Sequence, residues 1–444
     1  MQSFRIQGRR PLNGTIPVSG AKNAALPALA ATLLTEQPVQ LLGLPDVVDI
    51  RTMGRLLQHL GSTLEVRNDA ASRGRGLDLE LCGGAPDWSH QAPYDLVKTM
   101  RASVLTLGPA LARTGEARVS MPGGCAIGVR PIDQHLAGLE ALGAEVELEH
   151  GYVVARAPHG LVGGTFRFAM ETVTGTENVL MAATLARGTT VLERCAREPE
   201  VVDLADMLRA MGARIRGDGT ETIEVEGVDE LHAATHRILP DRIEAGTYLI
   251  AAALTEGQLL VEGARARDLK PLLELLQGAG ARIDDSPAGL LVEAEELRPL
   301  HVETAPHPGF PTDLQAQTLL LATQCHGDSE VVERVFENRF QHVPELNRMG
   351  AHITLRDRTA SVTGPRQLSG AVVMATDLRA SACLVLAGLI ADGVTRVDRI
   401  YHLDRGYQAM ELKLQQVGAD VERIDAPRAV TAQEQVVPAI VEER

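Results

Sequence analysis

The chain has 444 residues, of which 45% are hydrophobic and only 3% aromatic, so the composition predicts about three globular domains with aliphatic cores. Its net charge of -15 argues against non-specific binding to nucleic acid or to an anionic membrane, because both need a basic protein surface. An anionic ligand would therefore have to be held by a local cluster of cationic side chains.

The five cysteines are scattered along the chain and include no Cys-x-x-Cys pair. This pattern predicts neither a disulfide framework nor a structural zinc site, and it fits a reducing cytoplasm. The longest apolar run, around residues 380–391, is too short to cross a bilayer, and residues 1–20 have no apolar core of signal-peptide length. We therefore expect a cytoplasmic protein without membrane insertion.

In chain order, a pattern close to Leu-x-x-apolar-Gly-Ala-x-Val/Ile recurs six times. In each copy we expect a helix that ends at the glycine and passes directly into a strand, as at residues 202–211 followed by 213–215. An alanine-rich helix and another strand precede it, as at residues 179–188 and 190–192. The repeats predict an α/β fold of six helix-strand-helix-strand units. Their glycines are Gly61, Gly143, Gly212, Gly280, Gly350 and Gly418.

One cysteine lies in a glycine-rich segment, residues 121–133, which reads MPGGCAIGVRPID. Glycine near Cys125 on both sides gives the backbone freedom and lets a ligand approach closely. Arg130 follows five residues later, and a guanidinium favours the thiolate, which could lower the thiol pKa from about 8.5 towards neutrality. Cys125 is thus a candidate proton donor or nucleophile. These residues alone fit equally well a surface turn with a small apolar side chain packed beneath it.

Residues 122–135 resemble the cysteine loop of the bacterial UDP-N-acetylglucosamine 1-carboxyvinyltransferases, which are enolpyruvyl transferases. Further motifs of this family follow in the family's order across roughly residues 1–425, and on them the chain is identified as a member. These motifs are SGAKNAALP at 19–27, KTMRAS at 98–103, AREPE at 196–200, LPDRIE at 239–244, FPTD at 310–313, VFENRF at 335–340, DLRAS at 377–381 and YHLDRGY at 401–407.

The resemblance implies the inverted α/β prism, with two lobes of three units each and the active site between them. Cys125 would belong to the first lobe, and Asp313, Arg379 and Arg405 to the second. The boundaries that we expect are 22–239 for the first lobe, 1–21 plus 240–425 for the second, and 426–444 for a flexible C-terminal tail.

Enzymes of this family transfer the enolpyruvyl group of phosphoenolpyruvate to the 3′-hydroxyl of UDP-N-acetylglucosamine and release phosphate, which is the first committed step of peptidoglycan synthesis. The resemblance implies these two small-molecule substrates, no nucleic-acid partner, no metal and no other cofactor. The oligomeric state stays open. Two alternatives also remain: a related transferase that acts on shikimate 3-phosphate, and a homologue that binds UDP-sugars without turnover.

By match to the family, Cys125 would protonate the enol C3 and Asp313 would take the proton from the sugar hydroxyl. The residue patterns leave an alternative for each. His135 stands ten residues after Cys125, which allows a Cys-His nucleophile pair. Asp313 follows a Pro-Thr pair at the start of an expected helix at 314–323, where an aspartate is usually a helix cap.

A cluster of cations could do the work of a divalent ion, because guanidinium groups fit carboxylate and phosphate in bidentate geometry. Taken singly, each arginine is more often a solvated surface charge. The positions that match the family's phosphoenolpyruvate site are Lys22, Asn23, Arg130, Arg339, Arg379 and Arg405, with Arg339 and Arg379 near the carboxylate. Those that match its UDP-N-acetylglucosamine site are Asn23, Arg101, Arg130, Pro131, Ile132, Asp133, Gln134, Thr172, Val173, Asp313 and Val335. At Val48 some relatives carry a lysine, so an auxiliary cation would be missing here.

Overall fold

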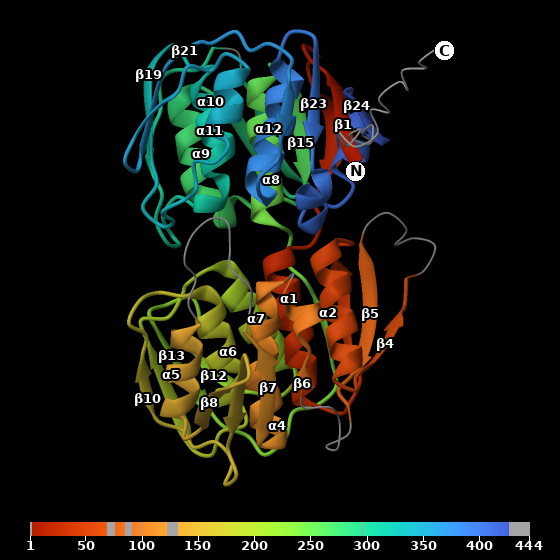
Figure 1. Cartoon of the computed structure of the whole chain (residues 1–444), viewed down its shortest axis with the longest axis vertical. Coiled ribbons are helices and arrows are strands. Elements are labelled where there is room, and N and C mark those ends of the chain that lie inside the picture. Colours follow the sequence, from red (N-terminus) through yellow and green to blue (C-terminus); the bar gives the residue numbers. More distant parts are fainter. Residues whose placement is uncertain are drawn as a thin grey trace, which may run out of the picture.

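The computed structural model describes residues 2–68, 76–84, 91–98, 100–121, 132–294 and 296–425. In these residues the chain forms two lobes stacked along its long axis (Figure 1). They contain six four-stranded sheets, three in each lobe, which confirms the predicted prism of six α/β units. None of the helices in the described ranges has the length and apolar character that crossing a membrane requires.

The first lobe follows the chain from α1 to β14. Its helices are α1 (Lys22–Ala31), η1 (Thr32–Leu34), α2 (Val48–His59), α3 (Tyr94–Val97), η2 (Arg101–Thr106), α4 (Leu107–Thr114), α5 (Asp133–Ala141), α6 (Val173–Ala183) and α7 (Pro199–Ala210). Its strands are β3 (Val39–Leu44), β4 (Thr63–Val66), β5 (Leu77–Cys82), β6 (Gln91–Ala92), β7 (Glu116–Ser120), β8 (Glu145–Glu149), β9 (Tyr152–Arg156), β10 (Thr165–Arg167), β11 (Thr189–Glu193), β12 (Arg214–Arg216), β13 (Thr222–Glu226) and β14 (Ala234–Arg237).

The second lobe combines the N-terminal strands with the chain from α8 onward. Its helices are α8 (Arg242–Leu254), α9 (Ala266–Ala279), η3 (Thr312–Leu314), α10 (Gln315–Ala322), α11 (Val343–Arg348), α12 (Leu378–Ile390), η4 (Ile400–Arg405) and α13 (Met410–Gln416). Its strands are β1 (Gln2–Gln7), β2 (Asn13–Pro17), β15 (Gln258–Glu262), β16 (Arg282–Ser286), β17 (Gly289–Glu293), β18 (His301–Glu303), β19 (Gly327–Val332), β20 (Thr354–Arg356), β21 (Thr359–Gly364), β22 (Val372–Met374), β23 (Val394–Asp398) and β24 (Asp420–Asp425).

The sheets share one pattern of strand directions, and each has four strands instead of the two in the predicted helix-strand-helix-strand unit. In the sheet β10-β11-β13-β12, the edge strand β10 runs parallel to β11, with Thr165 opposite Val191, and β11 runs antiparallel to β13. Each unit therefore gains an edge strand and a further antiparallel strand, which is the return strand of a hairpin in five sheets and the N-terminal strand β1 in the sheet β22-β23-β1-β24. The prediction missed β10 because its three residues are too few to show an alternating pattern.

The six repeat glycines lie at or just past the ends of α2, α5, α7, α9, α11 and α13, as the pattern predicted. Their φ angles run from 90° at Gly143 to 111° at Gly280, in the left-handed region that glycine adopts without steric cost. Each of these helices can therefore stop and turn directly into a strand.

The buried apolar side chains form two separate cores. One core lies within residues 21–239, and the other combines residues 4–16 with residues 243–421. In the second core α8, α10 and α12 contact one another and are buried on all sides, as their alanine- and leucine-rich sequences require.

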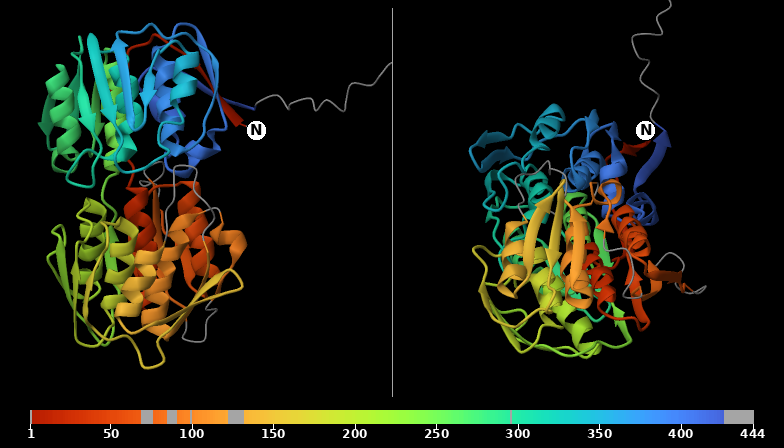
Figure 2. Two further views of the ribbon diagram at one scale, coloured as in Figure 1. Left: turned by 60° about the vertical axis from the view of Figure 1, so that its left-hand side comes forward. Right: turned by 60° about the horizontal axis from the view of Figure 1, so that its bottom comes forward.

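The chain passes between the lobes at two neighbouring segments, and Figure 2 shows the lobes from two further sides. Gly20 and Pro240 form an antiparallel bridge. On either side of it, the N–H of Ala21 donates to the carbonyl of Leu239 and the N–H of Asp241 donates to that of Ser19, both at 2.8 Å. The two crossings thus support each other through backbone hydrogen bonds.

Candidate active site

Asp313 lies where the second lobe faces the first, and it is held between two buried arginines. Its Oδ1 accepts a hydrogen bond from Arg339 Nη2 and its Oδ2 accepts one from Arg379 Nη2, both at 2.7 Å. Arg339 and Arg379 are each only 5% exposed. Burial alone would raise the pKa of Asp313, but Arg379 and Arg339 together hold it well below its usual range. The carboxylate is therefore ionised at neutral pH.

The alternative role of Asp313 as a helix cap is not observed. In the described part of the chain, neither η3 nor α10 begins with a side-chain cap hydrogen bond. Both carboxylate oxygens bind guanidinium groups that come from other elements, Arg379 from α12 and Arg339 from the segment between β19 and α11. The local sequence at a helix start gave no signal of these distant partners.

The two arginines differ in how their second amino group is used. Arg379 Nη1 lies 3.2 Å from the hydroxyl of Tyr407. Arg339 Nη1 is buried and has no hydrogen-bond partner among the described residues. A buried donor without an acceptor is costly. Within the described residues, Arg339 Nη1 is thus a donor that an anionic ligand could satisfy.

A second charged cluster joins the two lobes. Asp49, in α2 and only 4% exposed, accepts a hydrogen bond from Lys22 Nζ at 3.2 Å and another from Arg405 Nε at 2.9 Å. Burial lowers the pKa of Lys22, and nearby Arg379 and Arg405 act in the same direction while Asp49 opposes them. Lys22 and Arg405 thus both bind the carboxylate of Asp49. A phosphate group that replaced this carboxylate as their partner would bind both cations.

Five of the residues predicted to bind the nucleotide sugar lie at two helix starts in the first lobe. Gln134, near the start of α5, accepts a hydrogen bond on Oε1 from the N–H of Ala169 at 2.7 Å. Thr172 caps α6, because its Oγ1 accepts a hydrogen bond from the N–H of Gly175 at 3.3 Å. The bond from Gln134 therefore brings the two starts together. The five residues are Ile132, Asp133, Gln134, Thr172 and Val173.

Three other predicted binding residues lie elsewhere. Asn23 is exposed in the first turn of α1, next to Lys22, and Arg101 is half-buried at the start of η2. Val335 belongs to the second lobe, and its N–H donates to Glu333 Oε1 at 2.8 Å. Glu333 Oε2 accepts from Thr312 Oγ1 at 2.8 Å, so the segment with Val335 lies beside Asp313.

The predicted proton donor Cys125 lies outside the described residues, and so do Arg130 and Pro131. His135, its alternative partner in a Cys-His pair, is buried in α5, where its Nδ1 faces Asn178 Nδ2 at 3.0 Å and its Nε2 faces Thr174 Oγ1 at 3.2 Å. Burial lowers the pKa of His135 to about 3, with Arg101 acting in the same direction. A neutral histidine with both nitrogens engaged fits a structural role.

The sequence interpretation assigned no role to Asp49 or Tyr407. Asp49 lies in the first turn of α2, where an acidic residue is common and by itself indicates no functional role. Tyr407 belongs to the YHLDRGY motif, but the sequence does not indicate which residue its hydroxyl binds. The exposed Val48, where some relatives carry lysine, directly precedes Asp49 at the start of α2.

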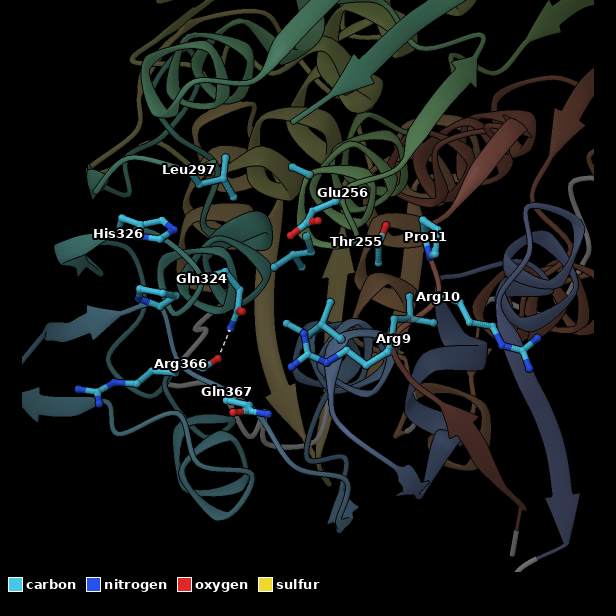
Figure 3. A pocket seen from close by; sticks show the side chains of 15 residues that line it. Arg9, Arg10, Pro11, Thr255, Glu256, Leu297, Gln324, His326, Arg366 and Gln367 are labelled. Carbon is cyan, nitrogen blue, oxygen red and sulfur yellow. Dashed lines mark hydrogen bonds between the residues drawn. The ribbon is translucent and has the colours of Figure 1, made fainter. Parts of the chain in front are cut away.

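A cavity of about 730 Å³ lies at the C-terminal ends of α8, α10 and α12, and Arg9, Gln324, His326 and Gln367 line part of it (Figure 3). Asp313 and Arg379 lie at the opposite ends of these helices. A helix of 13 residues such as α12 is about 20 Å long, so the cavity is well separated from the charged clusters. Nowhere in the described ranges are three or more His, Cys, Asp or Glu side chains grouped to hold a metal ion.

Comparisons with known proteins agree with the motifs. The family model of EPSP synthase (3-phosphoshikimate 1-carboxyvinyltransferase) matches residues 6–414. A protein of Anaeromyxobacter sp. (strain K) named UDP-N-acetylglucosamine 1-carboxyvinyltransferase is 54% identical over 426 residues, which are 96% of this chain and 100% of that protein. The chain belongs to this family of enolpyruvyl transferases. It is therefore a transferase, and the resemblance seen in the sequence is confirmed.

Other members of the family support the same assignment. A protein of the same name from Koribacter versatilis (strain Ellin345) is 55% identical over 96% of this chain and 97% of its own length. The enolpyruvyl transferase NikO from Streptomyces tendae is 27% identical, with a TM-score of 0.85 over 96% of this chain and 99% of NikO. EPSP synthase from Acinetobacter baumannii, at 17% identity and a TM-score of 0.74 over 96% of this chain and 100% of its own, shares the fold.

Proposed function

We propose that this enzyme transfers the enolpyruvyl group of phosphoenolpyruvate to the 3′-hydroxyl of UDP-N-acetylglucosamine and releases phosphate through a tetrahedral intermediate. The observation that carries the proposal is the 54% identity, over the full length of the relative, to a protein named for that reaction. The two charged clusters supply groups that the chemistry needs: cations for a substrate with about three negative charges, and an ionised carboxylate near them.

Phosphoenolpyruvate would bind with its phosphate at Lys22, Arg405 and Arg130, beside Asn23. Its carboxylate would lie near Arg379 and Arg339, where Arg339 Nη1 is buried without a partner in the described ranges. Arg405 has a side chain that is 40% exposed and can move onto a ligand more freely than Lys22, whose side chain is 13% exposed. In this arrangement Asp49 holds the two cations together until the phosphate arrives.

The nucleotide sugar would contact the two helix starts of the first lobe and reach the second lobe at Asp313 and Val335. Asp313 would orient the 3′-hydroxyl and accept its proton, and Cys125 would protonate the enol C3. The residues that we propose for the sugar nucleotide, besides Asp313, are Asn23, Arg101, Arg130, Pro131, Ile132, Asp133, Gln134, Thr172, Val173 and Val335.

We further propose that residues 22–239 and residues 1–21 with 240–425 move as two lobes about the paired crossings. Several contacts already bridge them. Arg242 binds Glu200 through two hydrogen bonds, at 3.0 and 3.2 Å. The N–H of Asp46 donates to Gln408 Oε1 at 2.8 Å. Substrates that bind between the lobes would add to these contacts and favour closure.

Phosphate release tests the proposed function. The purified enzyme is incubated with phosphoenolpyruvate and either UDP-N-acetylglucosamine or shikimate 3-phosphate, because the matching family model is named for the second acceptor. We expect phosphate release with UDP-N-acetylglucosamine alone. Release only with shikimate 3-phosphate would indicate the sister activity, and release with neither acceptor would indicate a binding protein without turnover.

A further inference from the structure

We propose that Tyr407 is a positioning residue of the active site, because its hydroxyl fixes Arg379 in the orientation that binds Asp313. The inference rests on the proposed function, in which Arg379 holds the carboxylate of phosphoenolpyruvate. Tyr407 itself would not touch either substrate.

The hydroxyl of Tyr407 lies where the three inner helices of the second lobe meet. It is 2.9 Å from Thr247 Oγ1 on α8, 3.3 Å from Gln317 Nε2 on α10, and 3.2 Å from Arg379 Nη1 on α12. Tyr407 is 2% exposed, and Thr247 and Gln317 are fully buried. One hydroxyl group thus joins three helices that carry or adjoin the charged residues of the site.

The direction of each hydrogen bond follows from the available protons. Thr247 donates its own proton to the carbonyl of Ile243 at 2.8 Å, so the Tyr407 O–H donates to Thr247 Oγ1. The phenol oxygen then accepts from Arg379 and from Gln317, which are both donors. Burial raises the pKa of Tyr407, while Arg379 and Thr247 oppose this shift. The group is a neutral phenol with every hydrogen-bonding position in use.

Arg379 is consequently held at two points. Its Nη2 binds Asp313 at 2.7 Å and its Nη1 binds the Tyr407 oxygen, so the plane of the guanidinium is fixed. Asp241, at the start of α8, and Lys22, across the lobe junction, also act on its charge. These two act at longer range and do not replace the hydrogen bond that sets the orientation.

Removal of the phenol oxygen would leave a buried N–H of Arg379 without its acceptor. The guanidinium would then rotate towards another acceptor. Small displacements of a substrate-binding group lower the catalytic rate strongly. The carboxylate of phosphoenolpyruvate would lose a fixed partner. The sites for UDP-N-acetylglucosamine in the first lobe would be unchanged.

The test compares Tyr407→Phe with Tyr248→Phe in the full-length enzyme. Tyr248 is a matched control, because it is equally buried in the second lobe and its hydroxyl also binds a charged side chain, Glu244, at 3.4 Å. For Tyr407→Phe we expect kcat/KM for phosphoenolpyruvate to fall about tenfold or more through a higher KM, with KM for UDP-N-acetylglucosamine within about twofold of wild type. Tyr248→Phe should leave both KM values near wild type.

Two outcomes would overturn the inference. They are an unchanged KM for phosphoenolpyruvate in folded Tyr407→Phe enzyme, whether or not kcat falls, and an equal rise of that KM in Tyr248→Phe. If Tyr407→Phe does not fold, Thr247→Val provides the test, because this change removes the acceptor of the Tyr407 proton. We expect Thr247→Val to raise KM for phosphoenolpyruvate, to a smaller extent than Tyr407→Phe. An unchanged KM for phosphoenolpyruvate in Thr247→Val would then refute the proposal. A wild-type enzyme that is inactive with both acceptors would instead refute the proposed function.

Discussion

Asp313 is under two opposing demands. Its two arginine partners hold its pKa well below the usual range, so it is ionised but weakly basic, whereas a general base works best with a pKa near the working pH. Phosphoenolpyruvate offers a way to meet both demands. If its carboxylate took part of the charge of Arg339 and Arg379, the proton affinity of Asp313 would rise only when the donor substrate was bound.

Asp313→Asn tests this role directly. The amide oxygen can still accept a hydrogen bond from one of the two arginines, whereas the amide NH2 group cannot accept one from the other, and the amide cannot accept the proton of the sugar hydroxyl. We expect turnover to fall by roughly two orders of magnitude or more, about what removal of a general base costs, with UDP-N-acetylglucosamine binding largely kept. Steady-state phosphate release measures turnover, and a calorimetric titration measures UDP-N-acetylglucosamine binding. Near-wild-type turnover would refute the assignment of Asp313 as the base.

The assignment of Cys125 predicts selective alkylation by fosfomycin, an epoxide that resembles part of phosphoenolpyruvate. Labelling of Cys125 should be faster with UDP-N-acetylglucosamine bound. Cys195, Cys325 and Cys383 should stay unlabelled because they are buried, and burial raises the pKa of Cys195 and of Cys325 to about 12. The half-buried Cys82, which we also expect to stay unlabelled, is the more demanding internal control.

Peptide mass mapping after brief exposure locates the label. Cys125→Asp should resist the drug and keep some turnover, because a carboxylic acid can donate a proton but attacks an epoxide poorly. A label on another cysteine, or none on Cys125 with the nucleotide sugar present, would contradict the assignment.

At the scale of elements, the helix-ending glycines can be tested with a pair of alanine substitutions. Gly143 has a φ of 90° and open space around its missing Cβ, so Gly143→Ala should cost about 1–2 kcal/mol of stability through backbone strain alone. Gly278 lies inside α9, also with open space, and Gly278→Ala should stabilise by up to about 1 kcal/mol. Urea unfolding measures both, and equal effects of the two changes would contradict the conformational explanation.

The same elements show what a single sequence can predict about this fold. The glycine repeat identified six units because a helix that turns directly into a strand needs one residue with positive φ. The edge strands escaped prediction because β6 has only two residues and β10 only three, and they pair with strands that their own sequence does not specify. The pairing of β1 was harder to predict from the sequence, because β1 completes a sheet with β23 and β24 from the other end of the chain.

At the scale of the whole molecule, the candidate site depends on contacts between distant parts of the chain. Asp49 and Arg405 are 356 residues apart in sequence and meet across the lobes. The family motifs pointed to Arg405, but nothing local to Asp49 indicated its partner. The bond between Tyr407 and Arg379 was unpredictable for the same reason, since it depends on how three helices pack.

Substrate binding between the lobes should make the molecule more compact. We expect small-angle scattering to show a smaller radius of gyration when UDP-N-acetylglucosamine is added, because bringing two lobes together shortens the mean internal distances. Shikimate 3-phosphate serves as the control ligand and should leave the radius unchanged. An unchanged radius at saturating nucleotide sugar would contradict closure of the lobes on this ligand.

The central claim, enolpyruvyl transfer to the sugar of UDP-N-acetylglucosamine, is tested most directly by the structure of the product. The enzyme is incubated with both substrates, and the nucleotide sugar is recovered and examined by mass spectrometry and proton NMR. The account predicts one enolpyruvyl ether per sugar, attached at the 3′-oxygen, with one inorganic phosphate released for each. Recovery of unmodified UDP-N-acetylglucosamine, or of an adduct at another position, would contradict it.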